Sequence, residues 1–277
     1  MIISIASGKG GTGKTTVAVN LALSLENVQL IDCDVEEPNG HIFLNPDIEK
    51  SEDVYVEYPV IDKEKCNLCG QCASFCMYNA IAVTKNDIMV FPELCHSCGG
   101  CKLVCPKDAI DYRKRSIGKI EGGKAGNIEF YQGILNIGEA RAIPIIKHLK
   151  RKIDKSKISI LDAPPGAGCS VIETIESSDF CILVTEPTPF GLYDLKIAVD
   201  VVRRLRIPFG VVINKDGIGD KRVEIYCSRE NIPVLLKIPF DREIATLYSK
   251  GVPFTSEMKE WRDRFREMFE RIKERMK

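Results

Sequence analysis

Short apolar runs alternate with amphipathic stretches along most of the chain. Strands are predicted where apolar residues run continuously, at 1–6, 28–33, 157–161, 181–185, 209–213 and 234–238. Helices are predicted where apolar residues recur every three or four positions, at 17–25, 143–153 and 192–205, and in a C-terminal stripe at 258–272. Strands that alternate with helices indicate an α/β fold with a doubly wound, mostly parallel sheet.

A glycine-rich loop follows the first predicted strand. Residues 8–15 fit the phosphate-binding pattern G-x-x-x-x-G-K-[ST] without a mismatch. In this pattern backbone N–H groups converge on phosphate oxygens, the lysine reaches the terminal phosphates and the hydroxyl binds Mg²⁺. A chance glycine-rich turn is the alternative, which the flanking strand and helix disfavour. The predicted nucleotide contacts are Gly8, Lys9, Gly10, Gly11, Thr12, Gly13, Lys14, Thr15 and Thr16.

Two other predicted strands end in carboxylates. Asp32 and Asp34 lie at the end of the strand at 28–33, and Asp162 follows the strand at 157–161. Such side chains point into the crevice where an open α/β sheet binds its ligand. We therefore expect Asp162 to support Mg²⁺ through water, together with Thr15. An ordinary polar strand end is the alternative for the first pair.

Residues 58–116 have a different composition from the rest of the chain. Eight of the 12 cysteines lie between 66 and 105, as the pattern C-x₂-C-x₂-C-x₃-C followed by a second copy 29 residues later. The flanks repeat as well, since Ala80-Ile81 recurs as Ala109-Ile110. This internal duplication predicts metal binding in a reducing compartment rather than disulfides.

The duplicated spacing resembles that of the bacterial two-cluster ferredoxins. In these proteins three thiolates of one copy bind one [4Fe-4S] cluster, and the fourth binds the other cluster. The resemblance implies a first cluster on Cys66, Cys69, Cys72 and Cys105, and a second on Cys76, Cys95, Cys98 and Cys101. Zinc is the alternative, because S₄ zinc sites also use C-x₂-C pairs. Two interleaved quartets disfavour it. Met77 replaces the proline that usually follows the fourth cysteine, and His96 is expected beside the cluster rather than as a ligand.

The loop K-G-G-T-G-K-T-T that starts at Lys9 resembles the deviant Walker A motif of the MinD/ParA/Mrp and nitrogenase-iron-protein ATPases. The resemblance implies that Lys9 contacts phosphate across a nucleotide-sandwich dimer. It also implies that Asp34 positions the attacking water and that Asp32 lies nearer to Mg²⁺. A solvated loop lysine is the alternative for Lys9. The stretch D-A-P-P-G from Asp162 resembles switch II of the Mrp branch.

The same resemblance implies that Asn214 and Pro239 contact the adenine. Residues 214–217 look like a guanine-reading N-K-x-D, but Gly217 stands where that motif needs Asp, so adenine is favoured. Cys169 lies seven residues after Asp162, the offset of a cluster-binding cysteine in the nitrogenase iron protein. The second cysteine which that protein needs is missing between 113 and 150, so we favour a small buried thiol.

The charge balance and the apolar runs of the chain indicate which kinds of partner to expect. The 39 basic residues balance the 39 acidic ones, so broad binding to nucleic acid is not expected. No apolar run reaches membrane-spanning length and residues 1–6 enter a strand directly, so a cytoplasmic protein is expected. A terminal helix of this kind binds membranes in MinD, but its mixed charge favours packing on the sheet, so membrane binding is not expected.

The sequence thus predicts a P-loop ATPase domain at 1–57 and 117–277, with an inserted α+β ferredoxin-like domain at 58–116. The expected cofactors are ATP, Mg²⁺ and two [4Fe-4S] clusters. We expect slow, partner-stimulated ATP hydrolysis in a homodimer, or in a heterodimer with a related ATPase. ATP would gate electron transfer to a redox partner. The alternative is an assembly or carrier ATPase of the Mrp type, which passes a cluster or metallocofactor to an accepting protein.

Overall fold

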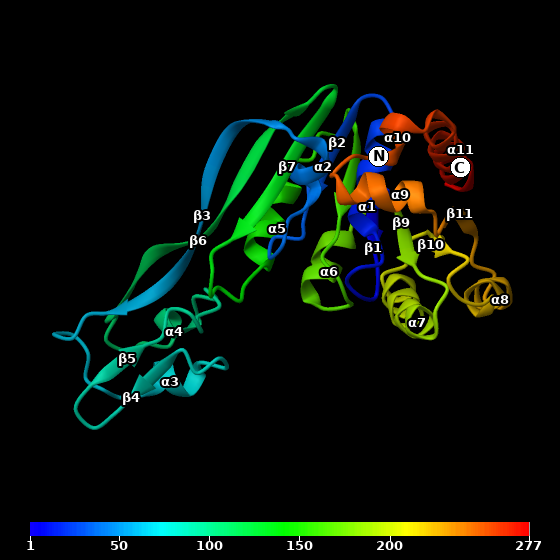
Figure 1. Ribbon diagram of the computed structural model, residues 1–277. Coiled ribbons are helices and arrows are strands. Elements are labelled where there is room, and N and C mark those ends of the chain that lie inside the picture. Colours follow the sequence, from blue (N-terminus) through cyan, green and yellow to red (C-terminus); the bar gives the residue numbers. More distant parts are fainter. Residues whose placement is uncertain (277) are drawn as a thin grey trace.

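A nine-stranded sheet runs through the body of the protein in the computed structural model, which describes residues 1–276 (Figure 1). Its strands, in spatial order, are β11 (Val234–Pro239), β10 (Phe209–Asp216), β9 (Phe180–Thr185), β1 (Ile2–Ala6), β8 (Ile158–Asp162), β2 (Val28–Asp32), β7 (Ile128–Leu135), β6 (Ile110–Ala125) and β3 (Asp47–Ile61). Neighbours from β11 to β7 pair in parallel, whereas β6 and β3 add antiparallel strands at one edge. The predicted mostly parallel sheet is confirmed.

The strand order reverses at β1, which lies between β8 and β9. Crevices at such a reversal bind ligands in open α/β sheets, because the connections leave the central strands on opposite faces. The loop after β1 therefore lies beside the ends of β8 and β2. Asp32 and Asp162 stand opposite each other in the parallel register of these two strands.

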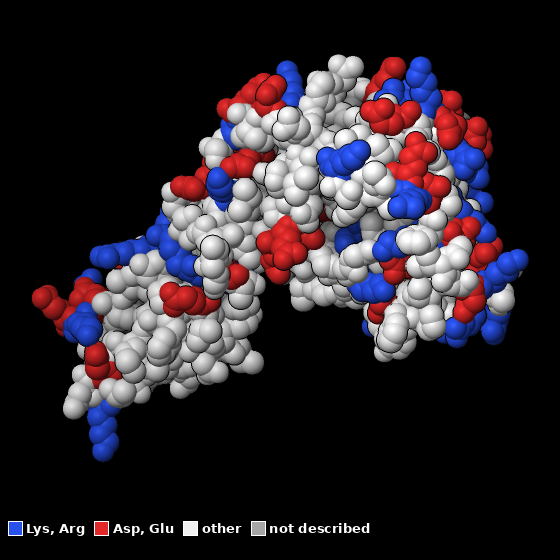
Figure 2. Space-filling view, viewed as in Figure 1, with Lys and Arg blue, Asp and Glu red and all other residues white. Residues whose placement is uncertain are grey.

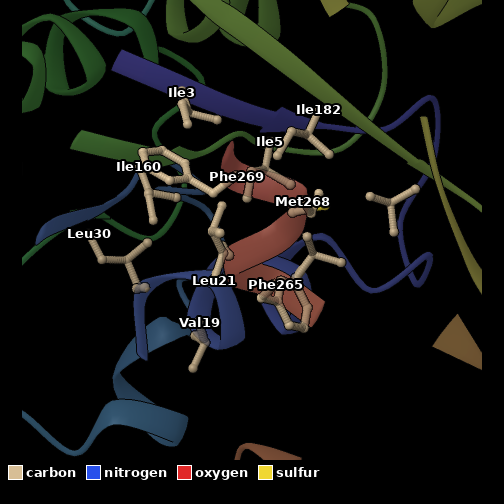
Figure 3. Packing of buried hydrophobic residues seen from close by; sticks show 14 of the residues in the cluster. Ile3, Ile5, Val19, Leu21, Leu30, Ile160, Ile182, Phe265, Met268 and Phe269 are labelled. Carbon is tan, nitrogen blue, oxygen red and sulfur yellow. The ribbon is translucent and has the colours of Figure 1, made fainter. Parts of the chain in front are cut away.

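Helices cover both faces of the sheet (Figure 1). On one face α1 (Lys14–Ser24), α10 (Phe254–Glu257) and α11 (Lys259–Arg275) enclose the largest apolar core. Figure 3 shows Leu21 of α1 and Phe265 of α11 packed against strand residues such as Ile5. The other face carries α5 (Ile143–Lys150), α6 (Cys169–Ile175), α7 (Pro189–Arg204) and α8 (Arg222–Arg229).

The stripe of the terminal helix is buried, as predicted. Trp261, Phe265, Met268, Phe269 and Ile272 of α11 are each at most 4% exposed. The charged residues between them face solvent, so the helix closes the core rather than presenting an apolar surface. Of the helices in the described part of the chain, none combines the length and apolar character needed to cross a bilayer.

A smaller lobe projects from the edge of the sheet on a long ribbon (Figure 1). The ribbon is formed by β3 and β6, which stay paired from Asp47↔Lys124 to Ile61↔Ile110. Gly123 fits this pairing because a side chain there would overlap the carbonyl oxygen of Asp47. The predicted domain boundaries at 57/58 and 116/117 fall within these continuous strands. The division into domains stays a prediction.

The backbone of the lobe shows the same duplication as the sequence. Its elements are α3 (Gln71–Phe75), β4 (Ile81–Val83), β5 (Ile88–Val90) and α4 (Gly100–Leu103). Left-handed backbone at Leu68 (φ 57°) recurs at Ser97 (φ 56°), and that at Asn79 (φ 52°) recurs at Asp108 (φ 45°). Each pair is separated by the same 29 residues as the cysteines. The two copies therefore fold alike around their cysteine loops.

Replacing Phe265 by alanine is expected to lower the free energy of unfolding by about 3–5 kcal/mol, because the ring is fully buried and its removal leaves a cavity. Urea denaturation followed by circular dichroism measures this. The control is Glu267→Ala on the exposed side of the same helix, which should change the value by less than about 0.5 kcal/mol. Equal effects of the two variants would contradict the packing described.

Candidate functional site

The glycine-rich loop is fixed by the neighbouring strand β10. The loop ends at Gly13, whose φ of 92° starts α1 at Lys14. A side chain at Gly13 would lie 2.3 Å from the amide nitrogen of Asn214. That amide donates a 2.8 Å hydrogen bond to the Thr12 carbonyl oxygen, and Asn214 is only 9% exposed. The residue predicted to contact adenine thus also supports the phosphate-binding loop.

A cavity of about 340 Å³ opens over this loop. Nine of its 19 lining residues were predicted as nucleotide or catalytic contacts: Gly10, Gly11, Gly13, Lys14, Thr15, Thr16, Asp34, Asn214 and Pro239. The opposite wall is apolar and includes Phe240, with Ile244 and Tyr248 of α9 (Arg242–Ser249). Phe240 follows Pro239 in the loop that was predicted to pack against the adenine. Ile244 and Tyr248 were not predicted, although their spacing of four residues indicates one face of a helix. A cavity with backbone N–H groups at one end and apolar side chains at the other suits a nucleotide.

Asp162 is the carboxylate with unsatisfied oxygens at the base of the site. It is 1% exposed, and neither of its carboxylate oxygens has a hydrogen-bond partner among the described residues. Burial, followed by the charge of Asp32, raises its pKa well above the ordinary value. Unpaired buried oxygens beside the cationic Lys14 and the hydroxyl of Thr15 fit a divalent cation.

Asp32 has a different environment. Its carboxylate accepts hydrogen bonds from the backbone N–H groups of Asp34 (3.0 Å), Asn39 (3.0 Å) and Gly40 (2.9 Å). These bonds fix the turn that leads from β2 into α2 (Gly40–Leu44). The role of Asp32 at Mg²⁺ stays a prediction. In the structure its carboxylate fixes the backbone of Asp34, which lines the cavity. Asp34 is half-buried there, and burial, followed by the charge of Asp32, raises its pKa to about 6.

The lobe contains two cavities, and each is lined by one of the predicted cysteine quartets. Cys66, Cys69, Cys72 and Cys105 line the first, and Cys76, Cys95, Cys98 and Cys101 line the second. Among residues 1–276 no group of three or more potential ligands is close enough to hold a single metal ion. A four-iron cluster is larger than one ion, so its thiolates surround a space rather than meet at a point.

Backbone N–H groups also point at cysteine sulfurs in matching places of the two copies. The Ala80 N–H donates to the Sγ of Cys76 at 3.4 Å, and the Ala109 N–H donates to the Sγ of Cys105 at 3.3 Å. Such bonds stabilise charge on thiolate sulfur and are typical around iron–sulfur clusters. The apolar lining, the cysteine sets and these donors fit the predicted clusters, and the ligand assignment stays a prediction.

Comparison with known proteins gives the family. Residues 3–254 match the CbiA family model, described as the CobQ/CobB/MinD/ParA nucleotide binding domain. The chain belongs to this MinD/ParA family. An uncharacterized protein of Methanocaldococcus jannaschii is 34% identical over 264 residues, which cover 92% of this chain and 91% of that protein. A protein named iron-sulfur cluster carrier protein, from Pyrococcus horikoshii, is 27% identical. The alignment covers 91% of this chain and 78% of that protein.

Solved structures of the family share the fold. The structure of the cell division ATPase MinD of Pyrococcus furiosus has a TM-score of 0.60 and 21% identity. The superposition covers 99% of this chain and 98% of that chain. MinD of Pyrococcus horikoshii, solved with Mg-ADP, gives a TM-score of 0.60 at 20% identity and covers 98% of this chain and 95% of its own.

The signature lysine of this MinD/ParA-family chain is held by a carboxylate that was not predicted. Lys9 lies 3.3 Å from the carboxylate of Glu186, which also pairs with Lys215 at 2.5 Å. Glu186 follows β9, and its place at a strand end was the available signal. Lys9 is therefore paired within the single chain, and its contact with phosphate across a dimer stays a prediction.

Two further sequence interpretations concern His96 and Cys169. His96 lines the second cysteine cavity and stacks on Tyr78, with ring centroids 3.6 Å apart, but it is not one of the quartet.

Cys169 was favoured as a buried thiol, and this prediction is wrong. The residue is exposed because it begins α6, where the chain has already left the sheet. The buried cysteines outside the lobe are instead Cys33, Cys181 and Cys227.

The free energy of unfolding of nucleotide-free, metal-free protein is expected to fall as pH rises from about 4 to about 6. Asp34 has a pKa near 3.8 when unfolded and about 6 when folded, so the folded state binds more protons in this window. Asp34→Asn removes this carboxyl and its repulsion of Asp32, so the fall should become shallower. Urea titrations at several pH values measure it. Glu267→Gln, on the exposed side of α11, should leave the slope unchanged. A slope in Asp34→Asn as steep as that of wild type would contradict the burial described.

Proposed function

We propose that this MinD/ParA-family chain is a Mg²⁺-dependent ATPase that carries iron–sulfur clusters in its projecting lobe and passes a cluster or metallocofactor to an accepting protein. The observation that carries the proposal is the presence of one nucleotide cavity and two four-cysteine cavities along one continuous sheet. Relatives named iron-sulfur cluster carrier protein, at 27% and 26% identity, support the same task.

The residues of the nucleotide cavity have separate tasks in this proposal. Lys14 and the loop N–H groups bind the phosphates, while the apolar wall and Asn214 hold the adenine. Thr15 and Asp162 would hold Mg²⁺, which neutralises charge that develops on the phosphates. Asp34 orients the attacking water. Lys9 reaches the phosphates of a second subunit only after it leaves Glu186, so hydrolysis is slow in the single chain and requires a homodimer or a related partner ATPase.

The lobe, residues 58–116, holds the clusters in this proposal, and residues 1–57 with 117–277 form the ATPase domain. Cys66, Cys69, Cys72 and Cys105 bind the first [4Fe-4S] cluster, and Cys76, Cys95, Cys98 and Cys101 bind the second. The reducing cytoplasm keeps such thiols available. On the side shown in Figure 2, acidic and basic side chains are interspersed over the body, whereas the lobe shows an uncharged area between its charged outer end and the body. Phe75, Met77 and Leu103 of the lobe are exposed and suit docking of a protein.

Electron transfer is the second candidate function. Each cavity has a complete set of four cysteines, and each set takes one cysteine from the other copy of the repeat. This interlocking is the arrangement of two-cluster ferredoxins, and it suits clusters that stay in the protein. ATP would then gate the flow of electrons to a redox partner, rather than release a cluster.

Anaerobically purified protein is expected to contain about eight irons per chain, as two [4Fe-4S] clusters require. Cys105→Ser and Cys76→Ser should each lose about four, because each removes a ligand from one cavity. Iron and acid-labile sulfide analysis gives the counts. The matched control is Cys227→Ser, a buried thiol outside the lobe, which should keep all eight. Zinc in place of iron, or full iron in both variants, would refute the assignment.

Iron-loaded protein mixed with a cluster-free [4Fe-4S] enzyme should restore that enzyme faster with MgATP than without it. Lys14→Ala should lose the acceleration, because this lysine reaches the phosphates. The activity of the acceptor measures the transfer. If the acceptor stays inactive while MgATP shifts the EPR spectrum of the dithionite-reduced protein, the electron-transfer candidate replaces the carrier.

A further inference from the structure

The loop that follows β2 at the nucleotide cavity is bonded to the end of β7. The N–H of Leu135 donates a 2.8 Å hydrogen bond to the carbonyl oxygen of Val35, the residue after Asp34. The side chain of Val35 is also buried against Ile145 and Ile146 of α5. The loop that carries Asp34 is therefore joined directly to the end of β7 and packs in the same apolar cluster as α5.

The segment 135–142 that joins β7 to α5 continues from this point toward the lobe (Figure 1). The N–H of Asn136 donates to the carbonyl oxygen of Ile117 on β6 at 2.9 Å, and the N–H of Glu139 donates to that of Asn136 at 3.0 Å. The segment thus bridges the body of the sheet and the ribbon that carries the lobe.

A buried charge cluster forms at the end of this segment. The carboxylate of Glu139 is 4% exposed and accepts hydrogen bonds from the backbone N–H (3.1 Å) and the Nε (2.9 Å) of Arg141. Arg115 of β6 lies 2.6 Å from the same carboxylate, as an ion pair without hydrogen-bond geometry. Glu139 therefore fixes the guanidinium of Arg141 in one orientation.

In that orientation Arg141 contacts the second cysteine loop. Its Nη1 donates to the carbonyl oxygen of Cys95, one of the four cysteines that line the second cavity. Its Nη2 is buried and has no hydrogen-bond partner among residues 1–276. Arg141 and Cys95 are 46 residues apart in sequence, so this hydrogen bond joins the segment next to α5 to the second cavity of the lobe.

We propose that Arg141 is a positioning residue that couples the nucleotide state of the body to the second cysteine cavity. The chain of contacts runs from Asp34 and Val35 through Leu135 and the segment 135–142 to Arg141 and Cys95. Movement of the Asp34 loop shifts this segment, and the shift reaches the Cys95 loop because Glu139 and Arg115 prevent the guanidinium from adjusting on its own. The first cavity lacks an equivalent contact with this segment in the described structure, so the effect is confined to the second.

The coupling rests on the proposed function only where the second cavity is taken to hold a cluster. The test is hydrogen–deuterium exchange of residues 95–101 in the iron-loaded full chain, with and without MgATP. In wild type, MgATP should change the exchange rate of this loop several-fold, and that of residues 66–72 should change little. In Arg141→Met, which keeps the stem and removes the donors, the response at 95–101 should be lost. Arg141→Lys should restore it only in part, because lysine lacks the planar fork.

The control is Arg113→Met, an exposed arginine on the same ribbon, which should respond like wild type. The thermal midpoint and MgATP affinity of each variant show that it is folded and binds nucleotide. A wild-type response in Arg141→Met, or a wild-type loop that is indifferent to MgATP, would overturn the coupling. Failure of the proposed function is seen separately, as wild-type protein that contains no iron, and the same exchange comparison made on the iron-free full chain then decides the role of Arg141.

Discussion

The structure depends on two carboxylates that are buried side by side at the carboxyl edge of the sheet. Asp32 and Asp162 end adjacent strands in register, and both are about 1% exposed. Burying two like charges is costly unless each is compensated. Asp32 is compensated by three backbone N–H groups, which fixes the turn that carries Asp34. Asp162 has no such bonds; the charge of Lys14 offsets part of the cost, burial and the charge of Asp32 raise its pKa, and the proposed Mg²⁺ would compensate the rest.

A second constraint is the double pairing of β6. Its C-terminal half pairs with β7, and nearly its whole length pairs with β3, so the lobe continues the sheet of the body. Two hydrogen-bonded strands resist bending far better than a flexible linker does. An insertion on a flexible linker would move independently of the nucleotide. Here the orientation of the lobe follows the sheet edge, and β7 at that edge is bonded directly to the loop after β2.

The sequence predicted the parts of the molecule in which short-range pattern determines structure. The P-loop, the central strands and the composition of the two cysteine cavities all follow from spacing along the chain. β3 was missed because its first seven residues, from Asp47 to Asp53, are all exposed and mostly charged, and buried side chains begin only at Val54. Cys169 was misjudged because thiols are usually buried, whereas this one starts a helix at the surface. Glu186 and Arg141 contact residues that are far away in sequence; the strand end marked Glu186 as a polar position, but no local pattern indicates either partner.

Any coupling between nucleotide binding and the occupancy of the lobe is reciprocal, because thermodynamic linkage requires it. If nucleotide binding shifts the lobe by a given free energy, occupancy of the lobe shifts nucleotide affinity by the same amount. Typical coupling energies of about 1–3 kcal/mol correspond to affinity changes of about 5-fold to 150-fold. Under the proposed coupling, a chain with loaded cavities and one with empty cavities would therefore bind ATP with different affinities. The loading of the lobe would in this way be part of the proposed nucleotide cycle.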